Sequence, residues 1–92
     1  TFTLWTDVLQ YLGEFETAIE ILLEASNVLP DEYEIEYRLA GLYFLMDDVT
    51  KGNLHLINGM KLEPKHLSLF QELFPVVWER IEVQNTISKF KK

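Results

Sequence analysis

Residues 11–30 read YLGEFETAIEILLEASNVLP, and this segment sets the architecture that we expect for the chain. Its apolar residues recur every three or four positions, which is the spacing of an amphipathic helix with one buried face. They are Ala18, Ile19, Leu22, Leu23, Ala25 and Leu29. Gly13 stands before this helix, where a preceding helix can end in the left-handed conformation, and Pro30 stands behind it. The segment therefore predicts the end of one helix, a tight turn and a second helix.

The rest of the chain carries the same periodicity. Apolar stripes at helical spacing run through residues 4–12, 33–46 and 54–62, and no segment alternates for long enough to predict a strand. Helices of about 10–15 residues that are joined by very short turns must lie antiparallel. Asp31 is the expected N-cap of the third helix, and Asp47 and Asp48 stand before the fourth. The sequence predicts an all-α fold.

The chain also repeats itself with a period of 34 residues. Pro30 and Pro64 are separated by this interval, and large apolar residues meet large apolar residues when the chain is aligned on itself. Small residues pair in the same register, Ala18 with Gly52 and Ala25 with Gly59. Unrelated amphipathic helices would share the helical periodicity but not the register of small residues and prolines. We therefore expect two similar helical hairpins.

In this period and in its pattern of small and apolar residues, the chain resembles the tetratricopeptide repeat family. The resemblance covers residues 1 to about 74 and is closest from Gly13 to Pro30. The second copy departs from the family pattern, because Asp47 replaces the turn glycine and glycines replace two usual alanines. The resemblance implies an α-solenoid of antiparallel helix-turn-helix repeats in a single domain, residues 1–92. Its parts would be a first repeat at 1–32, a second at 33–66 and a degenerate third repeat or cap at 67–92.

Small side chains let neighbouring helices approach to the usual 8–10 Å between axes. We expect Ala18 and Gly52 where the second helix of each repeat crosses the first. Ala25 and Gly59 are expected where the second helix meets the first helix of the next repeat. The full set of residues expected to serve repeat packing is Gly13, Ala18, Ala25, Pro30, Gly52, Gly59 and Pro64.

Beyond Pro64 the pattern changes. A helix that begins near Leu67 should end at about Phe74, because Pro75 lacks an amide hydrogen and favours the first position of a new helix. A final helix is expected from about Glu82, and Lys89, Lys91 and Lys92 would place positive charge at its C-terminal end.

The chain begins inside the first repeat, which suggests a piece of a longer repeat protein. In the family register, the face formed by Phe2, Trp5 and Leu9 would pack on a preceding repeat. Exposed in isolation, such a face favours self-association.

Composition excludes several classes of function. The 92 residues carry a net charge of −7 and have a pI near 4.7, which argues against nucleic acid as a partner. There is no cysteine for a disulfide, a zinc site or a nucleophile, and no apolar run approaches the ~20 residues of a membrane span. We expect a soluble protein and favour the cytoplasm, although the sequence does not determine the compartment.

No pattern of catalytic or cofactor-binding residues is present. The chain has no glycine-rich phosphate loop and no nucleophile at a recognisable distance from a base. His55 and His66 are eleven residues apart, which does not fit a zinc site on one helix, and we expect both on the surface. The acidic pairs are read as helix caps. We therefore expect neither an enzyme nor a bound cofactor or metal.

The resemblance implies a concave surface that binds a protein or peptide. Carried over position by position, its residues are Asp7, Tyr11, Tyr37, Arg38, Phe44 and Gln71. The cationic clamp that some family members use for a peptide carboxylate is absent, because the corresponding positions hold Thr3, Asp7 and Glu34. A neutral or basic partner segment is expected. Two alternatives stay open: a purely structural cap of a longer solenoid, and an oligomerisation module that uses the Phe2 and Trp5 edge or residues 70–78.

Overall fold

A computed structural model describes the backbone of residues 2–91 and the side chains of residues 7–90. Within these residues the chain forms helices and no strand, and 83% of the chain is helical. The all-α prediction is therefore confirmed. The helices are α1 Phe2–Tyr11, α2 Phe15–Val28, α3 Tyr33–Leu45, α4 Val49–Leu62, α5 Leu67–Leu73, α6 Pro75–Trp78 and α7 Ile81–Lys91, with the 3-10 turn η1 Pro64–His66 before α5.

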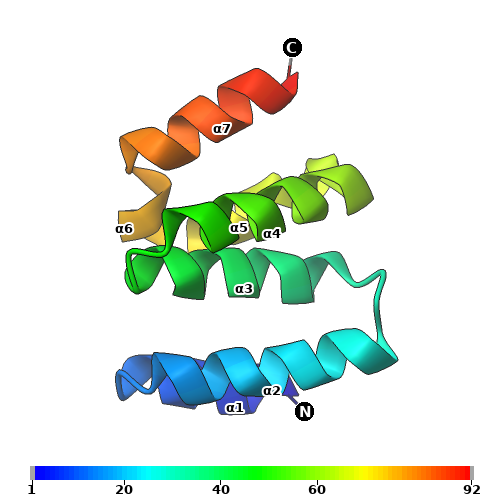
Figure 1. Ribbon diagram of the computed structural model, residues 1–92, viewed down its shortest axis with the longest axis vertical. Coiled ribbons are helices and arrows are strands. Elements are labelled where there is room, and N and C mark those ends of the chain that lie inside the picture. Colours follow the sequence, from blue (N-terminus) through cyan, green and yellow to red (C-terminus); the bar gives the residue numbers. More distant parts are fainter. Residues whose placement is uncertain (1, 92) are drawn as a thin grey trace.

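The helices are layered along the longest dimension of the molecule (Figure 1). α1 and α2 form the lowest layer, α3 and α4 follow, and α7 lies at the opposite end with the C-terminus. The chain reverses direction at one side between α1 and α2 and again between α3 and α4, and at the other side between α2 and α3. The first two pairs are therefore antiparallel hairpins, as the short turns predicted.

The 34-residue period of the sequence recurs in the backbone. α2 covers residues 15–28 and α4 covers residues 49–62, so the two helices begin and end in the same register. In the first turn the amide of Glu14 donates to the carbonyl of Leu9 at 2.8 Å, and in the second turn Asp48 donates to Tyr43 at 2.9 Å. Both turns thus close the preceding helix with the same backbone bond, five residues long.

Gly13 and Asp47 occupy the left-handed conformation at these two turns, with φ of 80° and 62°. Glycine adopts it without steric cost, and aspartate tolerates it better than most residues with a Cβ. This conformation lets the helix end in a Schellman-type motif. The predicted turn at Gly13 is confirmed, and Asp47 keeps the turn although it lacks the glycine.

Helix caps agree with the sequence in one case out of two. The carboxylate of Asp48 accepts a hydrogen bond from the amide of Lys51 at 3.2 Å and so caps α4, as expected. The prediction of Asp31 as the cap of α3 is wrong. That helix begins at Tyr33, so Glu32 holds the N-cap position, and its side chain makes no capping bond.

The core is built around α3, whose residues are buried on nearly all sides. Fully buried members are Ile35, Tyr37, Leu39, Ala40, Leu42 and Phe44. Leu22 from α2 and Leu56 from α4 reach this cluster, and Phe70 closes it from α5. A helix between two others needs apolar residues around its whole circumference, which explains why α3 lacks a strongly polar face.

The small residues lie at helix contacts, with one correction. Ala18, Gly52 and Gly59 are buried, and Ala25 packs half-buried against the core. A Cβ at Gly52 would lie 2.9 Å from the ring of Phe44, in the expected crossing of α3 and α4. A Cβ at Gly59 would lie 2.8 Å from the ring of Tyr37, which also belongs to α3. The prediction that Gly59 meets the next repeat is therefore wrong: both glycines serve the same hairpin.

The prolines lie on the surface at helix boundaries. Pro30 is exposed in the turn after α2, and Pro64 is exposed at the first position of η1. Pro75 opens α6 directly after α5 ends, as expected for a residue without an amide hydrogen. Phe74, between those two helices, packs against Gly41 so closely that a Cβ there would collide with the phenyl ring.

Among the helices that the structure describes, none combines the length and the apolar character needed to cross a bilayer.

Candidate functional site

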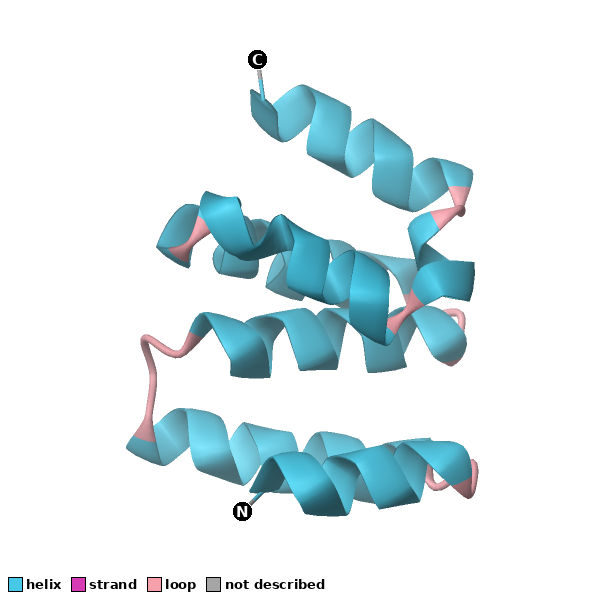
Figure 2. Ribbon diagram, turned by 180° about the vertical axis from the view of Figure 1, so that it is seen from behind, coloured by secondary structure: helices cyan, strands magenta, loops and turns pink. Residues whose placement is uncertain are grey.

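The predicted binding surface lies on the side of α1, α3 and α5, which Figure 2 views. Its centre is Arg38 on α3. The guanidinium Nη1 lies 2.6 Å from Oδ1 of Asp7 on α1, and Nε lies 3.1 Å from Oε2 of Glu34. The Arg38 side chain is only 8% exposed. Two carboxylates thus neutralise the one cation, so this part of the surface offers no free positive charge to a ligand.

Two predicted contact residues are corrected by their burial. Tyr37 and Phe44 have no exposed surface, so neither can contribute contact area to a partner. Gly59 and Gly52 bring α4 directly onto their two rings. Both aromatics instead hold the second hairpin together.

The hydroxyl of Tyr37 has a partner inside the protein. It donates a hydrogen bond to the backbone carbonyl of Glu63 at 3.0 Å, at the end of α4. Burial, together with the negative charge of Glu63 and the neighbouring Tyr33, raises the pKa of Tyr37 to about 12. Tyr37 is therefore a structural phenol that stays protonated well above neutral pH.

The remaining predicted residues are exposed. Tyr11 is 90% exposed at the end of α1, and the side chain of Asp7 is 55% exposed one turn earlier. Val8 and Leu12 follow the same helical face at 46% and 64% exposure. We call Asp7, Val8, Tyr11 and Leu12 the α1 surface. Gln71 is also exposed, on α5.

The α1 surface is unusual because three large apolar side chains adjoin one another without cover. Single exposed apolar residues are normal, whereas adjoining ones mark interaction sites. The side chains of Phe2 and Trp5, which the sequence placed on the N-terminal edge, lie outside the described residues. Leu9, the third member of that edge, packs half-buried against the core instead.

The other proposed self-association segment is mostly internal. Phe70, Phe74 and Val77 are buried, and Trp78 packs partly buried on Phe70 with ring centres 6.3 Å apart. Val76 is the large apolar residue of this segment that faces solvent, at 75% exposure. Residues 70–78 therefore dock α6 rather than present an apolar face.

His55 is not the plain surface residue that the sequence suggested. Its Nδ1 lies 2.6 Å from Oε2 of Glu36 on α3, and its ring stacks on Tyr43 with centres 5.4 Å apart. Both polar side chains are about 15% exposed. Lys51 covers the same tyrosine ring at 5.6 Å. His66 is exposed as expected, and it stacks on Tyr33.

The Glu36–His55 pair was missed because its members are 19 residues apart on different helices. Neither residue stands in a motif, so only the packing of α3 against α4 reveals the contact. The pair joins the two helices of the second hairpin.

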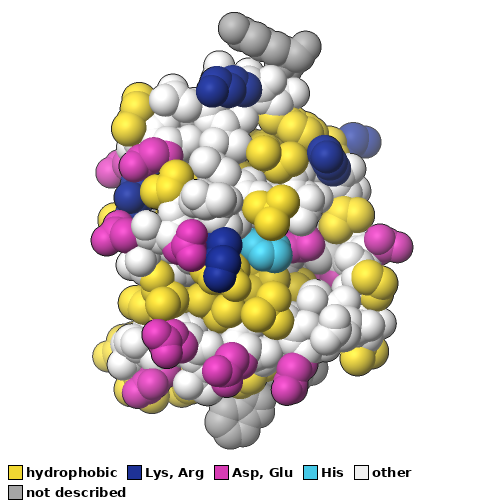
Figure 3. All heavy atoms as spheres, viewed as in Figure 1, with side chains coloured by type: hydrophobic (Ala, Val, Ile, Leu, Met, Phe, Trp, Pro, Cys, Tyr) yellow, Lys and Arg dark blue, Asp and Glu magenta, His cyan; other side chains and the backbone are white. Residues whose placement is uncertain are grey.

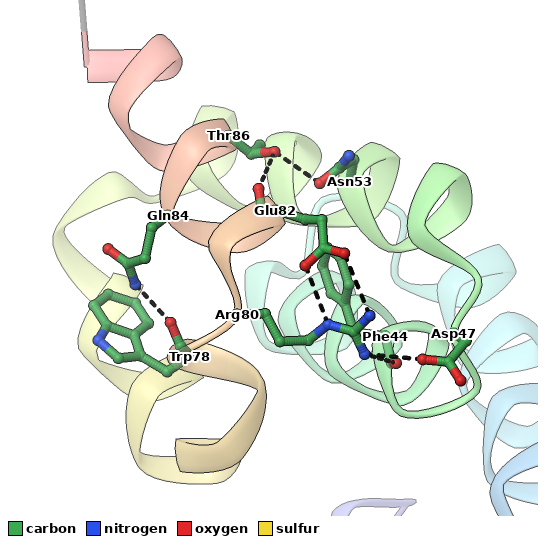
Figure 4. Close-up of polar contacts among 8 residues, drawn as sticks. All are labelled: Phe44, Asp47, Asn53, Trp78, Arg80, Glu82, Gln84 and Thr86. Atoms are coloured by element: carbon green, nitrogen blue, oxygen red, sulfur yellow. Dashed lines mark hydrogen bonds and ion pairs between the residues drawn. The ribbon is translucent and has the colours of Figure 1, made fainter.

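Arg80 makes the main polar connection between the C-terminal segment and the second hairpin (Figure 4). Its Nη1 donates to the carbonyl of Phe44 at 2.9 Å and to Oδ1 of Asp47 at 3.1 Å. Its Nε lies 3.4 Å from Oε1 of Glu82. These carboxylates raise the pKa of Arg80 further above its usual range. The amide of Glu82 itself, followed by Arg80, lowers the pKa of the Glu82 carboxyl.

The described residues offer little for catalysis. No group of three or more histidine, aspartate or glutamate side chains among them is placed to hold a metal ion. Every buried polar side-chain atom of these residues has a hydrogen-bond partner. The polar clusters are thus satisfied contacts between helices, and the feature that remains open to another molecule on the predicted side is the α1 surface.

Comparison with known proteins gives no relationship: no protein family matches this chain, and neither a curated protein nor a solved structure shows significant similarity to it.

Proposed function

We propose that this chain is a non-catalytic protein-interaction module, and that its helical hairpins are tetratricopeptide-like repeats of an α-solenoid. The recurrence of helix bounds and turn bonds after 34 residues supports this arrangement. Residues 67–92 would form a degenerate third repeat that covers the second hairpin.

The observation that carries the proposal is the α1 surface. A partner segment that covers Val8, Tyr11 and Leu12 would remove apolar area from water, which is the main source of binding free energy at interfaces. Tyrosine is a favoured interface residue because a large ring brings little conformational freedom to lose. The surface therefore suits the apolar face of a partner helix or extended segment.

Charge selects a neutral or basic partner. The chain carries −7, and Arg38 beside the α1 surface is already paired with Asp7 and Glu34. On the face shown in Figure 3, acidic side chains also follow the lower part of the molecule, where α2 lies. A basic segment would be attracted, and added salt would weaken its association.

The test uses two synthetic amphipathic helical peptides with leucine on one face and either lysine or glutamate on the other. In heteronuclear NMR titrations we expect the lysine peptide to shift the amide signals of residues 7–12, and we expect the glutamate peptide to have little effect. Leu12→Ala should weaken the lysine peptide by about tenfold, since a leucine buried at an interface contributes on the order of 1.5 kcal/mol.

Leu54→Ala is the matched control, because Leu54 is 55% exposed on α4, away from this surface. Equal losses in Leu12→Ala and Leu54→Ala, or equal binding of both peptides, would contradict the proposal.

Self-association is the second candidate, and the same observation favours it: an apolar surface at one end of the molecule can pair with a second copy. Sedimentation over a dilution series separates the two. A dimer that dissociates in Leu12→Ala but not in Leu54→Ala would assign the α1 surface to a second copy. A monomer at high concentration would leave it to a different protein.

A further inference from the structure

The described residues also form a groove between α4 and α7, at the opposite end of the molecule from the α1 surface. Its volume is about 410 Å³, within the usual range for small-molecule sites. It is lined by Asn53 and Ile57 of α4 and by Thr86, Lys89 and Phe90 of α7. The sequence gave no sign of it, since its two walls are about thirty residues apart and Lys89 was interpreted only as a helix-dipole partner.

The polar wall of the groove is arranged so that it offers hydrogen-bond donors. The hydroxyl of Thr86 donates to Oδ1 of Asn53 at 2.7 Å and lies 2.9 Å from the carbonyl of Glu82. The Asn53 oxygen is therefore used, and Figure 4 shows its amide nitrogen on the side away from Thr86. No acceptor among the described residues takes the hydrogens of that nitrogen.

The charge in the groove has the same preference. Lys89 is exposed, and no carboxylate of the described residues lies within ion-pair distance of it. Glu82 is the acidic residue nearest in sequence on α7, and its carboxylate is held by Arg80. An ammonium and an amide nitrogen both donate, so their common ligand is an acceptor with negative charge.

The other wall is apolar. Ile57 is half-buried, and the ring of Phe90 is 36% exposed. A ligand that matches all these features has a hydrocarbon part and one anionic acceptor group. An amine would meet Lys89 with like charge, and an alcohol would leave that ammonium without a counter-charge.

We propose that this groove binds a small apolar carboxylate of the medium-chain fatty acid class. Its hydrocarbon chain would lie on Ile57 and Phe90, and its carboxylate would accept hydrogen bonds from Nζ of Lys89 and Nδ2 of Asn53. The site is independent of the α1 surface, because it shares no residue with it.

The probe is decanoate, titrated into the whole chain and followed by heteronuclear NMR, with decanol and decylamine as controls. At about 0.3 kcal/mol for each non-hydrogen atom, decanoate should bind with a dissociation constant on the order of 1 mM. We expect its shifts to map to the amides of residues 53–57 and 86–90 and to the side-chain amide of Asn53. Equal binding of decanol, shifts elsewhere, or no shifts at ten times that concentration would overturn the proposal.

Asn53→Asp tests the donor directly. An aspartate keeps an oxygen to accept the Thr86 hydroxyl, but it replaces the amide donor with a negative acceptor. Decanoate should bind Asn53→Asp at least about tenfold more weakly. Asn58→Asp is the matched control, since it adds the same charge to α4 at a residue outside the groove. Equal weakening in both variants would mean that net charge, and not this site, governs binding.

Lys89→Gln supplies a second test, with Lys65→Gln as its control, because Lys65 is exposed in η1. We expect roughly fivefold weaker binding of decanoate in Lys89→Gln and no change in Lys65→Gln. Thermal melts of all four variants monitor folding. Full decanoate binding by Lys89→Gln would overturn the assignment of the carboxylate to Lys89.

Discussion

Asp47 shows how a single residue maintains a turn that its neighbour in the repeat makes with glycine. Its φ of 62° matches the 80° of Gly13, and the amide after each residue bonds five residues back. The side chain also contacts Arg80. That contact is weak, because the Asp47 carboxylate is 84% exposed and solvent screens the pair. The backbone conformation is therefore the main energetic feature at this position.

Replacing Asp47 with two residues that both lack the carboxylate isolates the backbone term. Asp47→Ala and Asp47→Gly lose the Arg80 contact equally, but only alanine pays for the left-handed conformation. We expect urea denaturation to show Asp47→Ala about 1 kcal/mol less stable than Asp47→Gly. If Asp47→Ala were as stable as Asp47→Gly, the left-handed turn would be contradicted.

Gly52 depends on space rather than on backbone conformation. A Cβ there would lie 2.9 Å from the ring of Phe44, which is fully buried and cannot move aside. Alanine gains about 1 kcal/mol of helix propensity, but overpacking a filled core costs about 1–3 kcal/mol. We expect Gly52→Ala to lower the free energy of unfolding by roughly 1 kcal/mol.

A double-mutant cycle provides the check on Gly52. Phe44→Leu makes room at Gly52, so the added cost of Gly52→Ala should vanish in that background. Gly59→Ala is the matched control, because its neighbour is Tyr37 and Phe44→Leu should not rescue it. Rescue of both glycine variants, or of neither, would disagree with the observed contacts.

Among the elements, α3 explains both the success and the failure of the sequence analysis. The helical spacing and the 34-residue register predicted the two hairpins, their turns and the break at Pro75, because these depend on local geometry and on residues without alternatives. Exposure is different, since it depends on what covers a helix. Tyr37 and Phe44 stood at positions of the expected concave surface, yet the absent side chains of Gly59 and Gly52 allow α4 to cover them.

The candidate sites were predictable to a smaller extent. Asp7 and Tyr11 were found in the sequence and are exposed, whereas Arg38 is nearly buried between carboxylates. Neither the Glu36–His55 pair nor the groove between α4 and α7 stands in any motif, because their members come together only when separate helices pack. Sequence periodicity specifies a helix face but not its neighbour.

α7 is attached to the rest of the molecule chiefly by a few named contacts. Arg80 bonds the carbonyl of Phe44 and the carboxylate of Asp47, and Thr86 bonds Asn53 (Figure 4). Val83 and Ile87 supply the buried apolar contacts. An element held by so small a set of contacts can open without global unfolding.

Arg80→Met should therefore loosen α7 selectively. The carbonyl of Phe44 loses its charged donor, and hydrogen bonds to charged groups contribute about 1.5–3 kcal/mol. In hydrogen exchange we expect the amides of residues 83–90 to exchange at least about tenfold faster, with α3 unchanged. Lys89→Met is the control, because it removes a cation from α7 without removing a contact to the hairpin. Uniform acceleration across all helices would show instead that α7 unfolds with the whole.

For the whole molecule, the ends and the centre differ in character. The α1 surface lies at one end and the groove between α4 and α7 lies toward the other, while α3 and its buried aromatics lie between them (Figure 1). Stability is thus concentrated in the second hairpin, and the two candidate binding surfaces lie beside it. Substitutions at either surface can be made without touching Tyr37, whose ionisation reports on the centre.

Tyr37 gives the stability of the whole molecule a specific dependence on alkaline pH. Its pKa rises from 10 in the unfolded chain to about 12 in the folded protein, first because of burial and then because of the charge on Glu63. Below pH 10 both states hold the phenolic proton. Between pH 10 and 12 only the unfolded state releases it, so the free energy of unfolding should fall by about 1.4 kcal/mol per pH unit from this group alone. Urea denaturation should find Tyr37→Phe less stable than the parent by about 1 kcal/mol at pH 9, since the bond to Glu63 is lost, and this deficit should disappear as the pH approaches 12. Tyr11→Phe changes an exposed phenol, so its curve should stay parallel to that of the parent. A deficit in Tyr37→Phe that is constant from pH 9 to 12 would mean that this phenol ionises as easily in the folded protein as in the unfolded chain.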